Sequence, residues 1–328
     1  MSDFDFVSTL SQFAGKRVLV IGDLMLDEHI WGTVERISPE APVMVVRANG
    51  DADCLPGGAA NVAYNIRALG GEAAVVGVIG DDEGGEILRR VLAAGGVDVN
   101  GVVADADRPT SRKTRIWASH RHQVVRVDRE NNTAISGAVV RRMIDYIYSA
   151  SKDVDAVLLS DYAKGVICSE VVAAATATAS VCVANIKPKN LSSFSDVGII
   201  TLNLAEASAA SGMDVGDLRQ VEEAGRLLLS RVGCRGIVIT RGANGLSAFG
   251  DGEITHIPAI ETEVYDVAGA GDTVVSALTM ALASGAALPE ACAIANSAGA
   301  AVVRKVGVAT TTTEEIAALL GQATSGKI

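Results

Sequence analysis

The chain has 328 residues, of which 49% are hydrophobic and 34 are glycine, enough to bury one large α/β core or two smaller ones. Its formal net charge of −11 disfavours a nucleic-acid partner, and no cluster of lysine and arginine indicates a membrane-surface patch. The start of the chain does not resemble a signal peptide, and no apolar run is long enough to span a bilayer. We therefore expect a cytoplasmic protein that acts on small molecules.

Short β-branched runs alternate with helical patterns along most of the chain. The runs predict strands at residues 17–21, 73–78, 156–160, 180–185, 198–202 and 236–240, and the patterns between them predict helices at 60–69, 86–94, 139–149, 169–177 and 218–231. This alternation predicts a doubly wound α/β domain in which helices flank a mainly parallel sheet. In such a domain, ligands bind at the carboxyl ends of the strands.

Residues 29–49 and 109–128 break this pattern, because polar and apolar residues alternate there without a helical period. We predict that they form a small β-sheet projecting from the core as a lid. No linker, internal repeat or low-complexity segment indicates a second domain, so residues 1–328 are predicted to form one domain carrying this insertion. The lid would cover a site or pair with a second copy of the chain.

The segment Asp266-Val267-Ala268-Gly269-Ala270-Gly271-Asp272-Thr273 precedes an apolar stretch with helical spacing. A glycine-rich turn that opens a helix leaves backbone N–H groups free to bind a transferring phosphoryl group. Asp272, in the first turn, is a candidate general base for an attacking hydroxyl. The alternative is a simple strand-to-helix turn with Asp272 as a capping carboxylate.

Two other segments suit a sugar. Asp23 and Asp27 follow the first predicted strand, and carboxylates accept directional hydrogen bonds from hydroxyl groups. Gly57 and Gly58 let the backbone approach a ligand, and Asn61 can both donate and accept. Turn chemistry alone is the alternative explanation for each segment.

Further polar residues follow later strands. The segment Ser160-Asp161-Tyr162-Ala163-Lys164-Gly165 contributes Lys164. Asn203 could contact phosphate oxygens and Glu206 could hold Mg²⁺ through water, although the two residues could instead form a helix capping box. The segment from Thr240 to Gly245 would wrap a nucleotide or form a hairpin turn.

In this order the segments resemble the ribokinase-like (PfkB) carbohydrate kinases. The matching landmarks run through nearly the whole chain: Gly57-Gly58 with Asn61, the glycine-rich residues 69–85, Asn203-x-x-Glu206, Thr240 to Gly245, and Gly269 to Asp272. The resemblance implies transfer of a phosphoryl group from ATP, with Mg²⁺, to a sugar hydroxyl. It also implies that Asp272 is the base and that the turn of Gly269, Ala270 and Gly271 stabilises the transferred charge.

Residues 36–43, 160–165 and 264–267 further resemble segments of D-glycero-β-D-manno-heptose 7-phosphate kinases. This resemblance implies phosphorylation of the anomeric O1 to the 1,7-bisphosphate, on the route to ADP-heptose and the lipopolysaccharide core. Such relatives are often fused to an adenylyltransferase with a His-x-Gly-His type motif, and none of the four histidines here stands in that setting. We expect no adenylyltransferase domain in this chain and a separate protein for that step.

The resemblance also implies the site residues. The substrate would contact Asp23, Asp27, Gly57, Gly58 and Asn61, with Lys164 and Asn185 nearby, and the lid would contribute Lys113, Arg115, Gln123 and Arg126 unless these are simply solvated strand residues. ATP would contact Asn203, Glu206, Thr240, Gly242, Gly245, Gly299 and Asn296, the last being alternatively an ordinary polar helix residue. Pairing of two lids predicts a homodimer.

The chain departs from the family pattern at two positions. Ala268 replaces the usual threonine, which leaves dependence on a monovalent cation open. The usual Asp-Pro-Lys appears as Asn185-Ile186-Lys187, so a neutral amide replaces an anion beside two lysines, Lys187 and Lys189. A more positive site suits the distal phosphate of a sugar phosphate, which makes Lys187 a candidate for binding it.

Three other functions compete with this one. The first is a kinase of the same fold acting on ribose, fructose 6-phosphate or a nucleoside, and residues 36–43 argue against it. The second is a catalytically silent relative that binds sugar or nucleotide, against which the intact Gly269–Asp272 turn argues. A dehydrogenase of the Rossmann type is disfavoured because no Gly-x-Gly-x-x-Gly follows the first predicted strand.

Overall fold

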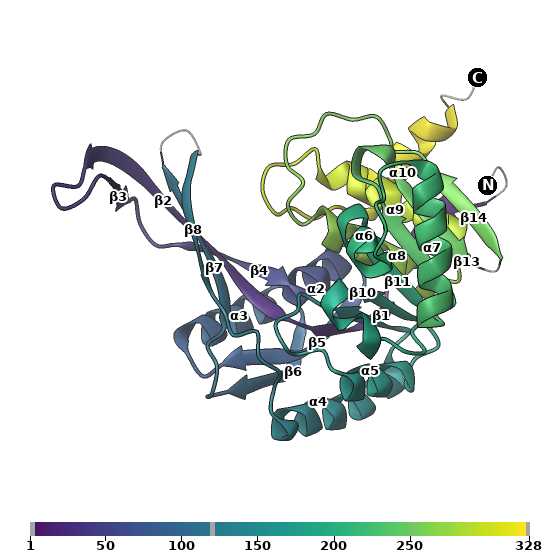
Figure 1. Ribbon diagram of the computed structural model, residues 1–328, viewed down its shortest axis with the longest axis horizontal. Helices are drawn as coiled ribbons and strands as arrows, with labels where there is room; N and C mark the ends of the chain where they lie inside the picture. The colour runs from purple at the N-terminus through teal and green to yellow at the C-terminus, as the bar shows by residue number, and fades with distance from the viewer. Residues whose placement is uncertain (1–3, 119–121, 251, 326–328) are drawn as a thin grey trace.

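The computed structural model describes residues 4–118, 122–250 and 252–325. A nine-stranded sheet with helices on both faces forms the body, and a smaller sheet extends away from it (Figure 1). The predicted doubly wound α/β fold is therefore confirmed. No helix among these described residues is both long enough and apolar enough to cross a membrane.

The large sheet has the strand order β14-β13-β12-β11-β10-β9-β1-β5-β6, in which the strands from β12 to β6 run parallel and β13 and β14 are antiparallel. The strands are β1 (Arg17–Gly22), β5 (Glu72–Gly80), β6 (Asp98–Asp105), β9 (Ala156–Ser160), β10 (Cys182–Asn185), β11 (Ile199–Asn203), β12 (Gly236–Thr240), β13 (Leu246–Gly250) and β14 (Glu253–Ile257). All six predicted strands are present. The chain passes from β1 to β5 on one side and later fills the other side from β9, so a crevice opens at the carboxyl ends near β1.

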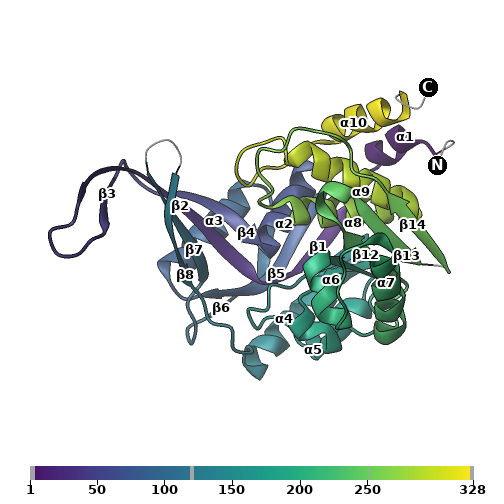
Figure 2. The same cartoon turned by 45° about the horizontal axis from the view of Figure 1, so that its top comes forward.

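Helices cover both faces of this sheet (Figure 2). They are α1 (Phe6–Ser11), α2 (Ala59–Ala68), α3 (Glu83–Ala94), α4 (Gly137–Ala150), α5 (Ser169–Thr176), α6 (Leu204–Ser211), α7 (Leu218–Val232), α8 (Ala270–Ala283), α9 (Leu288–Val302) and α10 (Thr313–Ser325). Side chains alternate along β1, so Val18 and Val20 pack with α2, α8 and α9, whereas Leu19 and Ile21 pack with α4, α5 and α7. Burial on both faces explains why the central strands are continuous apolar runs.

The smaller sheet, called the lid below, has the order β3-β2-β7-β8, with β4 paired to β2. Its strands are β2 (Leu24–Ile37), β3 (Met44–Ala48), β4 (Asp53–Gly58), β7 (Ser111–Ala118) and β8 (His122–Arg129). The predicted projecting sheet is confirmed, although residues 119–121 of the predicted segment lie outside the described residues.

The boundary of the lid differs from the prediction at the core end. β2 begins at Leu24 because Leu24, Met25 and Leu26 continue the apolar core without a break. Gly57 and Gly58 end strand β4, and Gly58, with a φ of 58°, is also the N-cap residue at which the chain turns into α2. The lid is therefore rooted directly beside the carboxyl end of β1.

Candidate active site

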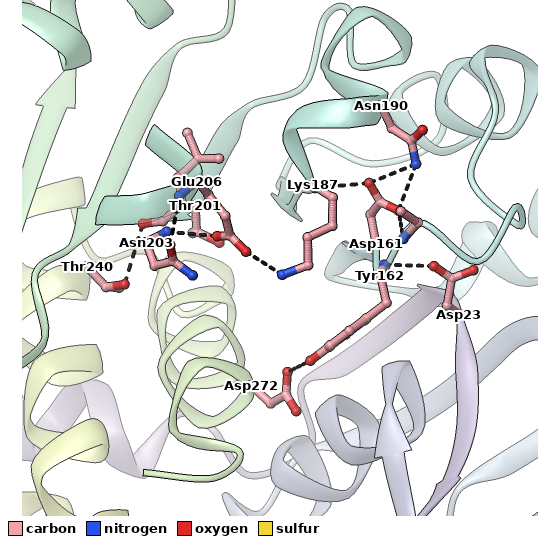
Figure 3. Close-up of polar contacts among 12 residues, drawn as sticks. Asp23, Asp161, Tyr162, Lys187, Asn190, Thr201, Asn203, Glu206, Thr240 and Asp272 are labelled. Carbon is pink, nitrogen blue, oxygen red and sulfur yellow. Dashed lines mark hydrogen bonds and ion pairs between the residues drawn. The ribbon is translucent and has the colours of Figure 1, made fainter. Parts of the chain in front are cut away.

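The candidate base lies at the start of α8, which begins after Gly269. Gly269 has a φ of 76°, a left-handed conformation that favours glycine. Asp272 is 5% exposed, and its Oδ2 accepts a hydrogen bond from Asn61 Nδ2 at 2.7 Å. Its Oδ1 accepts one from the Tyr162 hydroxyl at 2.5 Å, as Figure 3 shows. The carboxylate therefore faces other elements and does not cap its own helix, so the capping alternative is wrong.

Burial raises the pKa of Asp272 to about 6, against the lowering effect of the hydrogen bonds from Tyr162 and Asn61. The carboxylate is thus ionised at neutral pH and has a pKa closer to that pH than a free aspartate has. A general base works best under these conditions. In the turn before it, the N–H of Ala270 donates to the Val267 carbonyl, which leaves the following amides as the phosphoryl donors to consider.

Asn61 is fixed by a second pair of contacts. It is 3% exposed, and its backbone carbonyl accepts a hydrogen bond from Asn65 Nδ2 at 2.9 Å. The Oδ1 of Asn65 in turn accepts one from the Thr273 hydroxyl at 2.7 Å, beside the base. These bonds join α2 to α8, so the structure makes Asn61 a support for Asp272, and its predicted contact with the sugar stays a prediction.

A cavity of about 170 Å³ lies beside Asp272 at the carboxyl ends of β9 to β12. It is lined by Tyr162, Asn185, Lys187, Thr201, Leu202, Asn203, Glu206, Thr240, Gly269, Gly271, Asp272, Val274 and Val275. Eight of these, namely Asn185, Lys187, Asn203, Glu206, Thr240, Gly269, Gly271 and Asp272, are residues that the sequence predicts for the site from separate segments. Their convergence fits the rule that ligands of such sheets bind where the strand order reverses.

Asn203 and Glu206 form a capping box at the start of α6, as the alternative interpretation predicts. Asn203 Oδ1 accepts the Glu206 N–H at 2.8 Å, and Glu206 Oε2 accepts the Asn203 N–H at 2.9 Å. The other oxygen of Glu206 accepts a hydrogen bond from Lys187 Nζ (Figure 3). Lys187 thus lies at the wall of the Asp272 cavity, with its Nζ 5.3 Å from the centre of the Tyr162 ring.

The donor set of this cavity fits Mg²⁺ in one respect. Glu206 supplies a carboxylate, the ligand type that hard cations prefer. Because both of its oxygens already have partners, a metal ion fits here through a water molecule or after Lys187 has moved. The water-mediated contact expected for Glu206 stays a prediction.

The buried carboxylate of Asp23 holds the backbone of the loop after β9. It is 1% exposed, its Oδ2 accepts the N–H groups of Tyr162 at 2.7 Å and Lys164 at 3.1 Å, and its Oδ1 accepts that of Val166 at 3.3 Å. Burial raises the pKa of Asp23 to about 6. The carboxylate is covered by the loop that it holds, so its predicted contact with the sugar stays a prediction.

The side chain of Lys164 is occupied as well. Its Nζ forms an ion pair with Glu130 Oε2 at 2.7 Å, and the lysine is not among the residues that line the Asp272 cavity. Its predicted place near the substrate is therefore untested by the geometry of that cavity.

Asp27 lies at the root of the lid, where Arg115 Nη1 approaches its Oδ1 to 2.6 Å. A side chain at Gly57 would place its Cβ only 2.7 Å from the other oxygen, Asp27 Oδ2, and would therefore displace this carboxylate. The two predicted residues are thus in contact, and Asp27 already carries a positive partner.

The four predicted lid residues share one face. Strand pairing places Arg115 opposite Arg126 and Trp117 opposite Gln123, while Lys113, two residues from Arg115, shares its face. Arg126 forms an ion pair with Asp128 at 2.9 Å and its side chain is 48% exposed. The polar face of the lid therefore continues outward from Asp27.

A larger pocket, of about 770 Å³, adjoins the first one and shares Thr240, Gly271 and Val274 with it. It lies between the β12–β13 hairpin and α9, and all five residues predicted for this part of the ATP site line it: Thr240, Gly242, Gly245, Asn296 and Gly299. The 240–245 segment is thus a hairpin turn and a pocket wall at once. Asn296 Nδ2 also donates to the Pro258 carbonyl at 3.0 Å. The volume is in the range of small-molecule sites.

The sequence predicts most of this arrangement but misses Tyr162. The residue appears only inside the segment at the end of β9, and no spacing pattern indicates that its hydroxyl reaches a base 110 residues further along the chain.

Comparison with known proteins finds close relatives and the same fold. The bifunctional protein HldE of Trichlorobacter lovleyi is 41% identical over 322 residues, which cover 96% of this chain and 65% of that protein. The HldE of Geobacter sulfurreducens is 42% identical over 321 residues, with the same coverage of 96% and 65%. The chain thus spans 65% of the length of these two relatives.

Among solved structures, phosphofructokinase-2 from Escherichia coli in complex with potassium matches with a TM-score of 0.78 at 19% identity, covering 95% of this chain and 99% of that one. Arabidopsis thaliana ribokinase complexed with ribose and ATP matches with a TM-score of 0.70 at 20% identity, covering 94% and 99%. These two likenesses confirm the ribokinase-like fold. The family model of the pfkB family carbohydrate kinases matches residues 16–315, and the chain therefore belongs to this family and is a carbohydrate kinase.

Proposed function

We propose that the protein transfers the γ-phosphoryl group of ATP to the anomeric O1 of D-glycero-β-D-manno-heptose 7-phosphate, giving the 1,7-bisphosphate for ADP-heptose and lipopolysaccharide core synthesis. The observation that carries the transfer is the buried Asp272 carboxylate, which lines the smaller cavity next to the pocket expected for the nucleotide. The choice of sugar is supported by the resemblance of residues 36–43 to heptose 7-phosphate kinases and by the identity of 41% to 42% with the HldE proteins.

The reaction follows from the position of the base. Asp272 takes the proton of the sugar O1 while an oxygen lone pair forms the bond to the γ-phosphorus. The bond from that phosphorus to the bridging oxygen breaks, and its electron pair leaves with ADP. The amides of Gly271 and Asp272, in the first turn of α8, stabilise the charge on the transferred group.

Lys187 is assigned to the phosphoryl side of the reaction. Its ammonium lies in the Asp272 cavity beside Glu206, whereas the polar face of the lid begins at the Asp27–Arg115 pair. Lys187 therefore binds the transferring phosphoryl group, and the lid residues Lys113, Arg115, Gln123 and Arg126 bind the 7-phosphate. Mg²⁺, held through water by Glu206, would neutralise phosphate charge when bound.

The nucleotide base occupies the larger pocket. Its wall contains the apolar side chains of Ile260, Val264 and Val303 as well as Asn296, which supplies a polar group for orientation. Asn203 and Thr240 line the smaller cavity, where they would contact the phosphates.

A second copy of the chain covers the other face of the lid. Ile37, Val43, Met44, Val125 and Val127 are between 44% and 59% exposed there and near its tip. Val125 lies opposite Ile116, one position away from Arg115, so it points to the face opposite the polar one. Burial of this apolar surface would stabilise a homodimer. A separate adenylyltransferase and a cytoplasmic location complete the proposal.

ADP release with ATP and Mg²⁺ tests the proposal, using D-glycero-β-D-manno-heptose 7-phosphate, fructose 6-phosphate and ribose as acceptors and Asp272→Asn as the control. Turnover confined to the heptose phosphate and lost in the variant is the expected result. Turnover on another sugar would retain the kinase and reject the heptose. Tight ligand binding without any turnover would favour a silent binding protein.

A further inference from the structure

Tyr162 contacts the candidate base directly, and the proposed reaction gives it no role. Its hydroxyl donates to Asp272 Oδ1 at 2.5 Å, and its side chain lines the cavity where the phosphoryl group would transfer (Figure 3). The Tyr162 hydroxyl therefore occupies the position that the hydroxyl of a phosphoryl acceptor must take, because the base removes a proton from an O–H group.

The two oxygens of Asp272 are bonded in different ways. Oδ2 is bonded to Asn61, which is 3% exposed and is held by Asn65. Oδ1 is bonded to Tyr162, a cavity-lining side chain that reaches the base from a loop after β9. Only the second bond can be exchanged for a bond to a ligand without opening the packing between α2 and α8.

The backbone behind Tyr162 is fixed. Asp23 accepts the Tyr162 N–H at 2.7 Å, and Asp161 accepts the Ala163 N–H at 2.7 Å. Ala163 is held at a φ of 56°, which alanine seldom adopts, and Gly165 packs so closely on the Thr133 carbonyl that a Cβ there would lie 1.9 Å from its oxygen. Exchange at the base must therefore come from rotation of the Tyr162 side chain.

We propose that Tyr162 is a positioning residue that gates the base, its hydroxyl holding Asp272 Oδ1 until the acceptor hydroxyl of the sugar displaces it. The proposal rests on Asp272 being the base, as in the proposed function. In the sugar-free enzyme the gate excludes water from Oδ1. Without it, Asp272 would take a proton from water, the water oxygen would bond to the γ-phosphorus, and ADP would leave, giving inorganic phosphate.

The first test is Tyr162→Phe, which removes the hydroxyl and keeps the ring. Because the sugar no longer has to displace a hydrogen bond to a charged group, its KM is expected to fall by about threefold to tenfold, with kcat within about threefold of wild type. A purely structural role would not lower KM.

The pH profile gives a second readout of the same variant. Burial raises the pKa of Asp272 most, and Asp27 adds to this, whereas Tyr162, Asn61 and Lys187 lower it. Loss of the Tyr162 hydrogen bond therefore raises this pKa above about 6, so the acid limb of kcat/KM moves to higher pH.

The second variant is Tyr162→Leu, which also opens room for water. Phosphate release from ATP without sugar is expected to increase by about tenfold or more over wild type, with a smaller increase in Tyr162→Phe. Tyr146→Phe is the matched control, because its hydroxyl donates to Asp98 at 3.3 Å and neither residue lines the Asp272 cavity. It should leave all three quantities unchanged.

Two outcomes would overturn the gate. One is a Tyr162→Phe enzyme with an unchanged acid limb and unchanged KM, together with wild-type hydrolysis of ATP in Tyr162→Leu. The other is a fall in kcat of about a hundredfold in Tyr162→Phe at constant KM, which would make the hydroxyl part of the transition-state machinery. Hydrolysis without sugar needs no particular acceptor, so a failure of the heptose assignment leaves this test intact.

Discussion

The surroundings of Asp272 and the polar face of the lid differ in burial and in how far apart in the chain their contacting residues lie. Asp272 is 5% exposed, and its partners Asn61 and Tyr162 lie 211 and 110 residues away in the chain. On the lid, Arg126 pairs with Asp128 only two residues away, and its side chain is 48% exposed. The core thus fixes the base in one geometry, whereas solvated groups on the lid can adjust to a ligand. Substitutions at the base should change kcat, and substitutions on the lid should change KM.

The largest effect is expected at the base. Asp272→Asn should reduce kcat by about 10²–10⁴, the usual contribution of a positioned general base, because an amide cannot accept the proton. ATP binding, measured by calorimetry, should be retained. A variant with more than a tenth of wild-type kcat would show that another group takes the proton.

The next effect concerns Lys187. Lys187→Ala should reduce kcat by about 10–10³, because a cation beside the transferring phosphoryl group is lost. The reduction should be equal for heptose 7-phosphate and unphosphorylated heptose. A defect seen only with the phosphorylated sugar would show that Lys187 binds the distal phosphate. The surroundings of Asp272 and the polar face of the lid would then no longer have separate functions.

Acidification should lower activity through Asp272, and Asp23, whose pKa burial also raises to about 6, titrates in the same range. Asp272 has its pKa raised to about 6 by burial and must be ionised to accept a proton, so kcat/KM should fall about tenfold per unit below pH 6. A fixed-time activity assay between pH 5 and pH 8 measures this acid limb of the pH profile of kcat/KM. The limb should disappear from the residual activity of Asp272→Asn, and its persistence there would assign it to a different group.

Substitution on the lid should affect binding. Arg115→Gln leaves Asp27 without its partner at 2.6 Å and should raise the KM of the sugar phosphate by about tenfold, with little change in kcat. Arg47→Gln is a matched control, because Arg47 pairs with Glu35 at the exposed outer part of the lid. A large fall in kcat for Arg115→Gln would contradict the separation of the two regions.

The smallest effect on catalysis is expected at the apolar lid face. Val125→Glu should shift the mass measured by analytical ultracentrifugation from dimer toward monomer, because a charge replaces an apolar side chain in the proposed contact. A wild-type protein that is monomeric at all micromolar concentrations would refute the dimer.

The sequence predicts those parts of the molecule whose cause is local. The runs that became β9 and β12 are buried and apolar, so their boundaries are predicted to the residue. The sequence does not predict strands β6, β13 and β14, because they mix polar and apolar residues or end in glycine. Their conformation depends on pairing with neighbouring strands of the sheet. Gly57 and Gly58 indicate a turn, which Gly58 makes at the start of α2 with a φ of 58°, but the pairing of both residues with β2 has no local signal.

In the candidate site, too, contacts between residues near in the chain are predictable and contacts between distant residues are not. The capping box of Asn203 and Glu206 is visible in the sequence because its partners are three residues apart. The bonds from Asn61 and Tyr162 to Asp272 depend on how α2, β9 and α8 meet in the core. No spacing in the chain encodes them, so the base could be predicted while its supports could not.

Strand β2 joins the two regions. It runs for 14 residues, from Leu24 beside the carboxyl end of β1 to Ile37 near the exposed end of the lid, with a shift in its pairing to β3 between Val34 and Arg36, and spans about 43 Å at the usual rise per residue. A tilt of about 10° at its root would move the far end by about 8 Å, from the same rise. A change of the angle at the root of β2 would therefore move Asp27 slightly and the outer end of the lid much further. The same change of angle would accompany closure of the lid over a sugar and contact of the lid with a second molecule.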